Sequence, residues 1–254
     1  MNPALDVQGV SIAFGGLKAV SGFALSLPTG SLQGLIGPNG AGKTTLFNLL
    51  TGVYQPDTGT VLLDGKPLNG LAPHRIAAAG LARTFQNIRL FKELSVLDNV
   101  RIACHQSTQV GIFGALLRTP AWYREEAAIE HRSRELLALF GLSARADEPA
   151  ASLPYGDQRR LEIARALALK PKVLLLDEPA AGMNPQEKVE LRELIRRVRG
   201  EFGLTVLLIE HDMGLVMDLC ERITVLDHGV VISVGTPAEV QQDPAVIEAY
   251  LGTS

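Results

Sequence analysis

A glycine-rich stretch carries the clearest chemical pattern of the chain. It fits the pattern G-x-x-x-x-G-K-[ST] and consists of Gly37, Pro38, Asn39, Gly40, Ala41, Gly42, Lys43, Thr44 and Thr45. Glycines let a backbone approach an anion closely, and successive N–H groups then point at it. The lysine would reach the β- and γ-phosphates, and the threonine after it would offer its hydroxyl to Mg²⁺. The stretch therefore predicts a site for a nucleoside triphosphate.

Two adjacent carboxylates form a second candidate group. Asp177 and Glu178 follow residues 173–176, an all-apolar run typical of a strand covered on both faces in a parallel sheet. Two carboxylates at a buried strand end are costly unless a metal ion neutralises one of them. We therefore expect Asp177 to hold the Mg²⁺ that bridges the phosphates and Glu178 to polarise an attacking water.

Two single residues also carry possible chemistry, each with a simpler alternative. His211 follows another apolar run, residues 204–209, and could donate a hydrogen bond to the γ-phosphate or the water. A lone histidine is, however, usually structural. Phe14 lies at a turn upstream of the glycine-rich stretch and could stack on adenine, or could cover the core of a hairpin. The residues alone leave both alternatives open.

Strands and helices in alternation must position these groups. The glycine-rich stretch lies between an apolar run of strand type, residues 32–36, and residues 45–50, which have helical apolar spacing. An antiparallel hairpin, residues 5–12 and 19–27, precedes it. The further strands that we expect are at residues 60–63, 81–86, 173–176, 204–209, 222–226 and 230–234, and the further helices at residues 73–79, 185–199 and 237–252.

The character of the chain changes between residues 93 and 142, where helices follow one another without strand signals. Ser95 can cap a helix that runs through Cys104, and a longer helix at residues 120–140 stops at Gly141. Such an insertion suggests a helical subdomain attached to an α/β core. We predict an α/β fold with an N-terminal antiparallel β-subdomain, with residues 1–92 and 166–254 as the core and residues 93–165 as the helical subdomain.

The composition is that of an ordinary soluble chain. Its 254 residues are 20% charged and 46% hydrophobic, and a net charge of -3 gives no electrostatic case for nucleic acid. The sequence has no run of eighteen apolar residues and no basic-then-apolar N-terminus, so we expect a cytoplasmic location. Cys104 and Cys220 lack metal-ligand spacing and read as reduced packing residues.

Together these motifs resemble, over essentially the whole chain, the nucleotide-binding subunit of an ATP-binding-cassette (ABC) transporter, a P-loop NTPase. The resemblance implies that Phe14 is the A-loop aromatic, Gln86 the Q-loop glutamine and residues 181–185 the D-loop. It implies Glu178, His211 and Gln86 as catalytic residues, and Thr44, Gln86 and Asp177 as Mg²⁺ ligands beside ATP. The implied signature motif, which acts on the opposite subunit, consists of Leu153, Pro154, Tyr155, Gly156, Asp157 and Gln158.

Three stretches are similar to the LivG-type subunit of branched-chain amino-acid importers. They are residues 84–91, 154–167 and 178–185. The signature departs from the general Leu-Ser-Gly-Gly-Gln, because Pro154 replaces the serine, Tyr155 a glycine and Asp157 the glutamine. Pro154 offers neither a hydroxyl nor an N–H to a phosphate, so we expect a heterodimer with a different cassette.

The resemblance also implies partners and a location. We expect a second ABC ATPase subunit, two transmembrane permease subunits and a periplasmic or extracellular solute-binding protein, at the cytoplasmic face of the inner membrane, without nucleic acid. A soluble ABC protein of translation or DNA repair is an alternative, although such proteins usually carry two cassettes or a long coiled-coil insertion. A catalytically silent regulatory cassette is another alternative, but the intact Glu178 and His211 argue against it. An importer for another solute is an alternative that the sequence leaves open.

Overall fold

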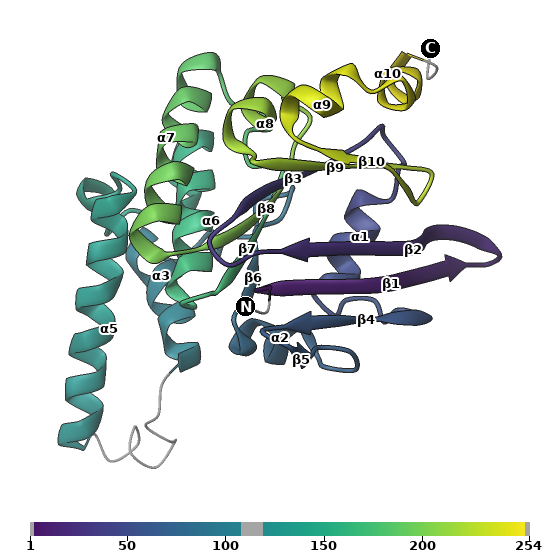
Figure 1. Cartoon of the computed structure of the whole chain (residues 1–254). Helices are drawn as coiled ribbons and strands as arrows, with labels where there is room; N and C mark the ends of the chain where they lie inside the picture. The colour runs from purple at the N-terminus through teal and green to yellow at the C-terminus, as the bar shows by residue number, and fades with distance from the viewer. Residues whose placement is uncertain (1–2, 108–118, 252–254) are drawn as a thin grey trace.

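The computed structural model describes residues 3–107 and 119–251, and its strands form two sheets (Figure 1). The strands are β1 (Leu5–Phe14), β2 (Leu17–Leu27), β3 (Leu32–Ile36), β4 (Thr58–Leu63), β5 (Lys66–Pro67), β6 (Leu81–Arg83), β7 (Val173–Asp177), β8 (Thr205–Ile209), β9 (Arg222–Asp227) and β10 (Val230–Gly235). One sheet is antiparallel in the order β2-β1-β4-β5. The other has the order β10-β9-β3-β8-β7-β6, with β10 antiparallel to β9 and the remaining pairs parallel.

Helices connect and cover the strands of the parallel sheet. They are α1 (Lys43–Leu50), α2 (Pro73–Ala79), α3 (Val96–Cys104), α5 (Pro120–Leu139), α6 (Tyr155–Ala168), α7 (Pro185–Phe202), α8 (Met213–Leu219), α9 (Pro237–Gln242) and α10 (Pro244–Leu251). Among the described residues, no helix is both long enough and apolar enough to cross a lipid bilayer.

Local capping chemistry fixes where several helices begin. Ser95 Oγ accepts the N–H of Asp98 at 3.0 Å and so caps α3, as the sequence predicted. At the start of α7, Asn184 and Glu187 each accept the other's backbone N–H, at 3.0 and 2.8 Å, which is a complete capping box. Pro185 occupies the first helical position, where a missing N–H costs nothing. These caps satisfy donors that a helix N-terminus leaves without an internal partner.

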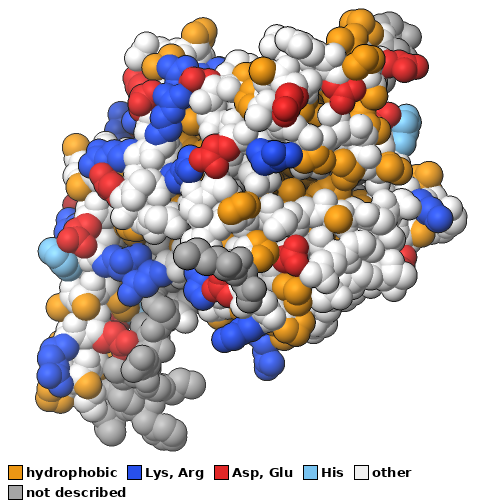
Figure 2. All heavy atoms as spheres, in the orientation of Figure 1, with side chains coloured by type: hydrophobic (Ala, Val, Ile, Leu, Met, Phe, Trp, Pro, Cys, Tyr) orange, Lys and Arg blue, Asp and Glu red, His pale blue; other side chains and the backbone are white. Residues whose placement is uncertain are grey.

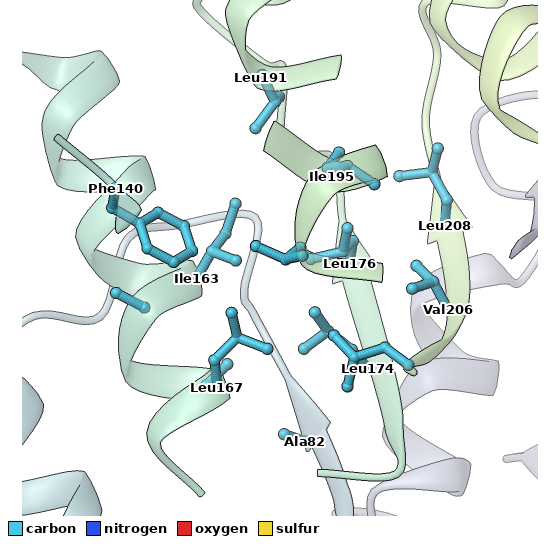
Figure 3. Packing of buried hydrophobic residues seen from close by; sticks show 14 of the residues in the cluster. Ala82, Phe140, Ile163, Leu167, Leu174, Leu176, Leu191, Ile195, Val206 and Leu208 are labelled. Carbon is cyan, nitrogen blue, oxygen red and sulfur yellow. The ribbon is translucent and has the colours of Figure 1, made fainter. Parts of the chain in front are cut away.

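The two faces of the parallel sheet bury different cores because side chains alternate along a strand. On one face, Leu174 and Leu176 of β7 and Val206 and Leu208 of β8 pack against α6 and α7 (Figure 3). On the other face, Leu175 belongs to a second core shared with α1 and the antiparallel sheet. Burying one such side chain stabilises a fold by roughly 1.5–3 kcal/mol. The central strands are therefore fixed from both sides.

Three helices lie together on one flank of the sheet, where we predicted a helical subdomain. α3, α5 and α6 contact one another, and Figure 1 shows α5 as the outermost of them. Their buried side chains join the same core as the helix-covered face of the sheet. The boundary that we predicted at residue 165 falls within α6, which continues to Ala168 and packs on β7 through Leu167.

The outer surface of α5 and α7 is a mixed-charge face. Figure 2 shows basic and acidic side chains interspersed over α5 and α7. Arg134 pairs with Glu130 and Arg197 with Glu201, each at 2.7 Å across one helical turn. Exposed pairs of this kind contribute about 0.3–0.5 kcal/mol each. They therefore contribute little to the stability of the fold.

Several predicted elements are wrong in extent, and the helix predicted at residues 185–199, for example, continues to Phe202. The strand predicted at residues 81–86 ends at Arg83, because the backbone of Phe85 bonds instead to side chains of α6. The helix predicted at residues 237–252 is two helices, with an extended residue, Asp243, between them. Proline at position 244 disfavours a helical conformation in the residue before it, so α9 ends there. Residue 252 lies outside the described part of the chain.

We predict that Cys220 resists alkylation in the folded protein. Burial, reinforced by the nearby carboxylate of Glu221, raises the pKa of the Cys220 thiol to about 12. Because the thiolate is the reactive form, almost none is present at about pH 8. Mass spectrometry after iodoacetamide treatment should find Cys220 unmodified without denaturant and modified in urea. Prompt labelling of the folded chain would contradict this packing.

Candidate functional site

The glycine-rich loop lies where β3 turns into α1, as its sequence context predicted. Gly42 has φ +103°, a backbone conformation that favours glycine, and a Cβ there would lie 2.6 Å from the carbonyl oxygen of Ala19. A Cβ at Gly37 would collide with the carbonyl oxygen of Leu226. Both glycines are thus required by neighbouring backbone. The loop is held against β2 and β9 while its other side faces a cavity.

Lys43 lies inside the curve of this loop. Its Nζ donates to the carbonyl oxygens of Gly37 at 2.7 Å and Pro38 at 2.9 Å, and the residue is 6% exposed. Burial lowers the pKa of the ammonium group, and the carboxylates of Glu178 and Asp177 partly offset that shift. The loop therefore presents a positive charge that is poorly hydrated, which suits the binding of a polyanion.

Asp177, at the end of β7, is 2% exposed and forms a buried ion pair. Arg83 Nη2 of the neighbouring strand β6 lies 2.6 Å from Asp177 Oδ2. The guanidinium also donates to Asn48 Oδ1 at 2.7 Å, and it lies over the rings of Phe47 and Phe85, at 5.3 and 5.0 Å from their centroids. Arg83 thus supplies a counter-charge that makes a buried aspartate tolerable.

Glu178 is held at both oxygens of its carboxylate. Gln86 Nε2 donates to Oε2 at 2.8 Å, and His211 Nε2 lies 2.8 Å from Oε1. The backbone of Glu178 has φ +47°, which is unusual for a residue other than glycine, and its N–H donates to the carbonyl oxygen of Ile209 at 2.9 Å. Two segments far from Glu178 in the sequence therefore fix its carboxylate.

Glu210 is a buried carboxylate that joins the segments of Glu178 and His211. It is 3% exposed, and it accepts the backbone N–H of Ala180 at 2.7 Å, of His211 at 3.0 Å and of Asp212 at 3.3 Å. Burial raises the pKa of Glu210, and the three N–H groups partly offset the rise. The loop after Glu178 and the loop that carries His211 are thus tied to one side chain.

A cavity of about 270 Å³ lies between these groups. Its lining residues are Asn39, Gly40, Ala41, Gly42, Lys43, Thr44, Thr45, Gln86, Glu178 and His211. The fold therefore brings most of the predicted nucleotide-binding residues together with the three predicted catalytic ones. Asp177 does not line this cavity and lies buried behind it, while Gly37 and Pro38 form the base of the loop through their bonds to Lys43.

Phe14 does not line the cavity. It is 45% exposed at the end of β1, and its ring meets the ring of Tyr54 edge-on, with the centroids 5.2 Å apart. A ring exposed to this degree does not simply cover the core of the hairpin. It could offer a face to a flat base, with Tyr54 setting its orientation.

The predicted signature residues lie apart from the cavity, at the start of α6. Pro154 caps that helix and is exposed, and Leu153 is buried. The ring of Tyr155 lies over Gly182, where a Cβ would be 3.1 Å from it, and its hydroxyl accepts from Arg159 at 3.0 Å. Gly156 is buried, Gln158 Nε2 donates to the Leu153 carbonyl oxygen at 2.9 Å, and Asp157 Oδ2 lies 3.8 Å from Arg145 Nε. Tyr155 thus packs within its own chain.

Oxygen donors at the cavity and buried next to it fit Mg²⁺. This ion favours oxygen ligands and is usually bound through one or two carboxylates together with substrate phosphates and waters. The Asp177 carboxylate and the Thr44 hydroxyl are such donors, and Gln86 has a side-chain oxygen besides the nitrogen that binds Glu178. In residues 3–107 and 119–251, no cluster of three or more His, Cys, Asp or Glu side chains could hold a metal ion unaided.

Sequence reasoning missed Arg83 and Glu210. A signal existed for Glu210, because it follows the buried strand β8 just as Asp177 and Glu178 come at the end of β7. Arg83 is a charged residue inside a predicted strand, which could have suggested a buried partner. Neither signal identifies the distant partner, which is Asp177 for Arg83 and the backbone N–H of Ala180 for Glu210.

Comparison with known proteins agrees with this geometry. Residues 20–181 match a family model described as ABC transporter, and residues 230–254 match one described as branched-chain amino acid ATP-binding cassette transporter. The chain is 49% identical over 250 residues to the high-affinity branched-chain amino acid transport ATP-binding protein LivG of Salmonella typhimurium, and 46% identical to BraF of Pseudomonas aeruginosa, with 98% of each chain covered in both cases.

Solved structures show the same fold. A crystal structure of an ATP-binding cassette of an ABC transporter in its ADP conformation has a TM-score of 0.85 and 30% identity, covering 99% of this chain and 100% of the other. A nucleotide-free cassette gives the same TM-score and identity, with 97% and 98% covered. The cavity, the loop and the relatives agree, and the chain belongs to the family of ABC transporter ATPases.

Proposed function

We propose that this chain hydrolyses ATP to energise an importer of branched-chain or other hydrophobic amino acids. The observation that carries the proposal is the position of Glu178, held by Gln86 and His211 at the edge of the cavity formed by the phosphate loop. A carboxylate oriented beside a phosphate-binding loop can act as a general base on water. The names of the LivG and BraF relatives support the choice of solute.

Binding of ATP follows from the loop. The backbone N–H groups at the start of α1 and the ammonium group of Lys43 bind the phosphates, and Phe14 stacks on the adenine. Thr44, Asp177 and Gln86 would hold Mg²⁺, which when bound neutralises charge on the transferred phosphoryl group. Arg83 orients the Asp177 carboxylate through their ion pair.

Hydrolysis then needs a group that accepts the proton of the attacking water, and groups that orient this acceptor. The water oxygen bonds to the γ-phosphorus, the bond to the β,γ-bridging oxygen breaks, and ADP leaves with that oxygen. Glu178 accepts the proton of the water, while Gln86 and His211 fix the direction of its carboxylate. His211 is 42% exposed at its side chain, so it can also donate to the γ-phosphate.

A groove beside the Q-loop suits a membrane subunit. It has a volume of about 550 Å³ and lies between the segment after β6 and helices α3 and α6. Phe91 and Ile102 line it and are 47% and 41% exposed, next to Arg89 and Arg165. We propose that a cytoplasmic helix of a permease subunit docks there, with residues 93–165 as the helical subdomain that receives it. The chain would then lie at the cytoplasmic face of the inner membrane, and two permeases and a solute-binding protein would complete the importer.

The altered signature favours pairing with a different cassette. Pro154 can donate no hydrogen bond to a phosphate on an opposing subunit, and a bond of that kind contributes roughly 1.5–3 kcal/mol. The hydroxyl of Tyr155 is engaged by Arg159 of its own chain. We propose that the phosphate loop, Glu178 and His211 of this chain work against the signature of a second, different ABC subunit.

Glu178→Gln should separate binding from turnover. We expect ATP affinity to stay within about twofold of wild type, because Lys43 and Asp177 are unchanged, and turnover to fall by about 100-fold or more, because an amide accepts no proton. Lys43→Ala should instead weaken ATP binding by about 10-fold. Nucleotide titration and phosphate release check both variants. Wild-type turnover in the glutamine variant would sink the assignment of Glu178.

The solute is tested by uptake. We expect deletion of the gene to reduce uptake of labelled leucine, isoleucine and valine, and a plasmid copy, but not the Glu178→Gln copy, to restore it. Uptake of a charged amino acid serves as the control. Unaltered uptake of all three hydrophobic amino acids would count against the proposed solute class.

The asymmetric pairing is tested by mass and rate together. We expect the purified chain to stay mostly monomeric with ATP in analytical ultracentrifugation, and its turnover to rise markedly when the second cassette and the permeases are added. The reason is the donor that Pro154 lacks at each of the two sites of a homodimer. A tight ATP-dependent homodimer that is as fast as the whole complex would show the pairing to be symmetric.

A further inference from the structure

Helix α6 carries a buried ion pair that the chemistry above does not use. Arg159 is 1% exposed and Glu162 is 5% exposed, and Arg159 Nη1 lies 3.1 Å from Glu162 Oε2 across one helical turn. Their neighbour Arg160 points outward and pairs with Glu190, which is partly exposed. The helix thus turns one arginine inward, where only a specific set of acceptors makes its burial tolerable.

Those acceptors are the backbone of the Q-loop. Arg159 Nη1 donates to the carbonyl oxygen of Phe85 at 2.6 Å, and Nη2 donates to the carbonyl oxygen of Gln86. In the other direction, Glu162 Oε1 accepts the N–H of Phe85 at 3.2 Å and of Arg89 at 3.4 Å. One turn of α6 therefore takes over the hydrogen bonds of the chain after β6 ends.

The Arg159–Glu162 pair is not needed for the stability of the fold as such. A buried ion pair can often be replaced by apolar side chains without loss of stability, whereas loss of one partner leaves an uncompensated charge. Burial raises the pKa of Glu162, and the N–H of Phe85 and the charge of Arg159 offset the rise only in part. Its specific effect is on geometry, because it fixes the backbone from which the Gln86 side chain reaches Glu178.

We propose that Arg159 and Glu162 are positioning residues for hydrolysis, which brace the Q-loop against α6 so that Gln86 keeps its hold on Glu178. The side chain of Gln86 lies 2.8 Å from that carboxylate, so a shift of the loop changes the direction of the proton acceptor. A misplacement of about 1 Å can lower a rate by about 100-fold. The inference rests on the roles proposed above for Gln86 and Glu178.

The brace also gives Tyr155 a role within its own chain. Its hydroxyl accepts from Arg159 Nη2 at 3.0 Å, the same nitrogen that donates to the Gln86 carbonyl oxygen. A movement of the signature segment is therefore transmitted through Arg159 to the Q-loop, and from Gln86 to Glu178. Helix α6 thus links a residue at the surface to the catalytic carboxylate through the Arg159 side chain and the backbone and side chain of Gln86.

The test is a double-mutant cycle in the full-length chain assembled with its transporter subunits. The brace variant Arg159→Met/Glu162→Leu removes both charges, so no unpaired charge stays buried and the fold is kept. We expect its kcat for ATP to fall by about 10-fold with KM unchanged. Gln86→Ala should lower kcat at least as much, because it also removes a proposed Mg²⁺ ligand. The combined variant should be no slower than Gln86→Ala alone, because the brace acts through the contact of Gln86 with Glu178.

Two further variants and a measurement of hydrogen exchange complete the test. Arg160→Met removes the outward arginine and should match wild type. Glu162→Gln keeps an acceptor oxygen for the Q-loop amides but removes the counter-charge of Arg159, so it should be slower than Arg160→Met. Hydrogen exchange of the purified full-length chain should show faster exchange at the amides of Phe85 and Arg89 in the brace variant than in the Arg160→Met control.

The outcomes separate this inference from the function proposed above. If the losses of kcat in the brace variant and in Gln86→Ala multiply in the combined variant, or if the brace variant is as fast as wild type, the proposed role of Arg159 and Glu162 is wrong. The role of Gln86 is then unaffected. Unchanged exchange at Phe85 and Arg89 would also contradict the brace, without any measurement of activity. If Gln86→Ala alone leaves kcat unchanged, the role of Gln86 fails, and the brace fails with it.

Discussion

The parallel pairing of β3, β8 and β7 is the constraint on which the rest of the structure depends. Adjacent parallel strands bring their carboxyl ends to one edge of a sheet, and here that edge receives the phosphate loop after β3, His211 after β8 and Glu178 after β7. Each strand is buried on both faces by two cores, so its end cannot slide along the strand axis. The cavity forms where these three ends meet.

Much of this arrangement could be predicted because it depends on local sequence patterns. The strand at Leu32–Ile36, the helix at Pro73–Ala79 and the cap at Ser95 lie where the sequence placed them. The glycine-rich loop could be recognised in the sequence because only glycine tolerates the close backbone contact at Gly42. Such features depend on spacing, turn chemistry and steric limits, which neighbouring residues determine among themselves.

The rest depends on pairs that are far apart in the sequence. The partner of Asp177 is Arg83, and the partners of Glu210 are backbone groups, which carry no mark in a sequence. The early end of β6 has the same origin, because the backbone exchanged a strand partner for side chains of α6. The short helix α8 went unpredicted because, unlike the equally long α2, it has neither a proline at its first position nor a glycine after its end. Where buried charges meet backbone, local propensity is a poor guide.

The left-handed backbone at Glu178 places the site in conflict with the stability of the fold. Of the residues other than glycine, few tolerate φ +47° without strain, which is of the order of 1–3 kcal/mol at such positions. Glycine or asparagine at this position would relax the chain, yet neither has a carboxylate. Selection for a more stable cassette and selection for a working one therefore pull this position in opposite directions, and drift toward greater thermal stability would pass through inactive proteins.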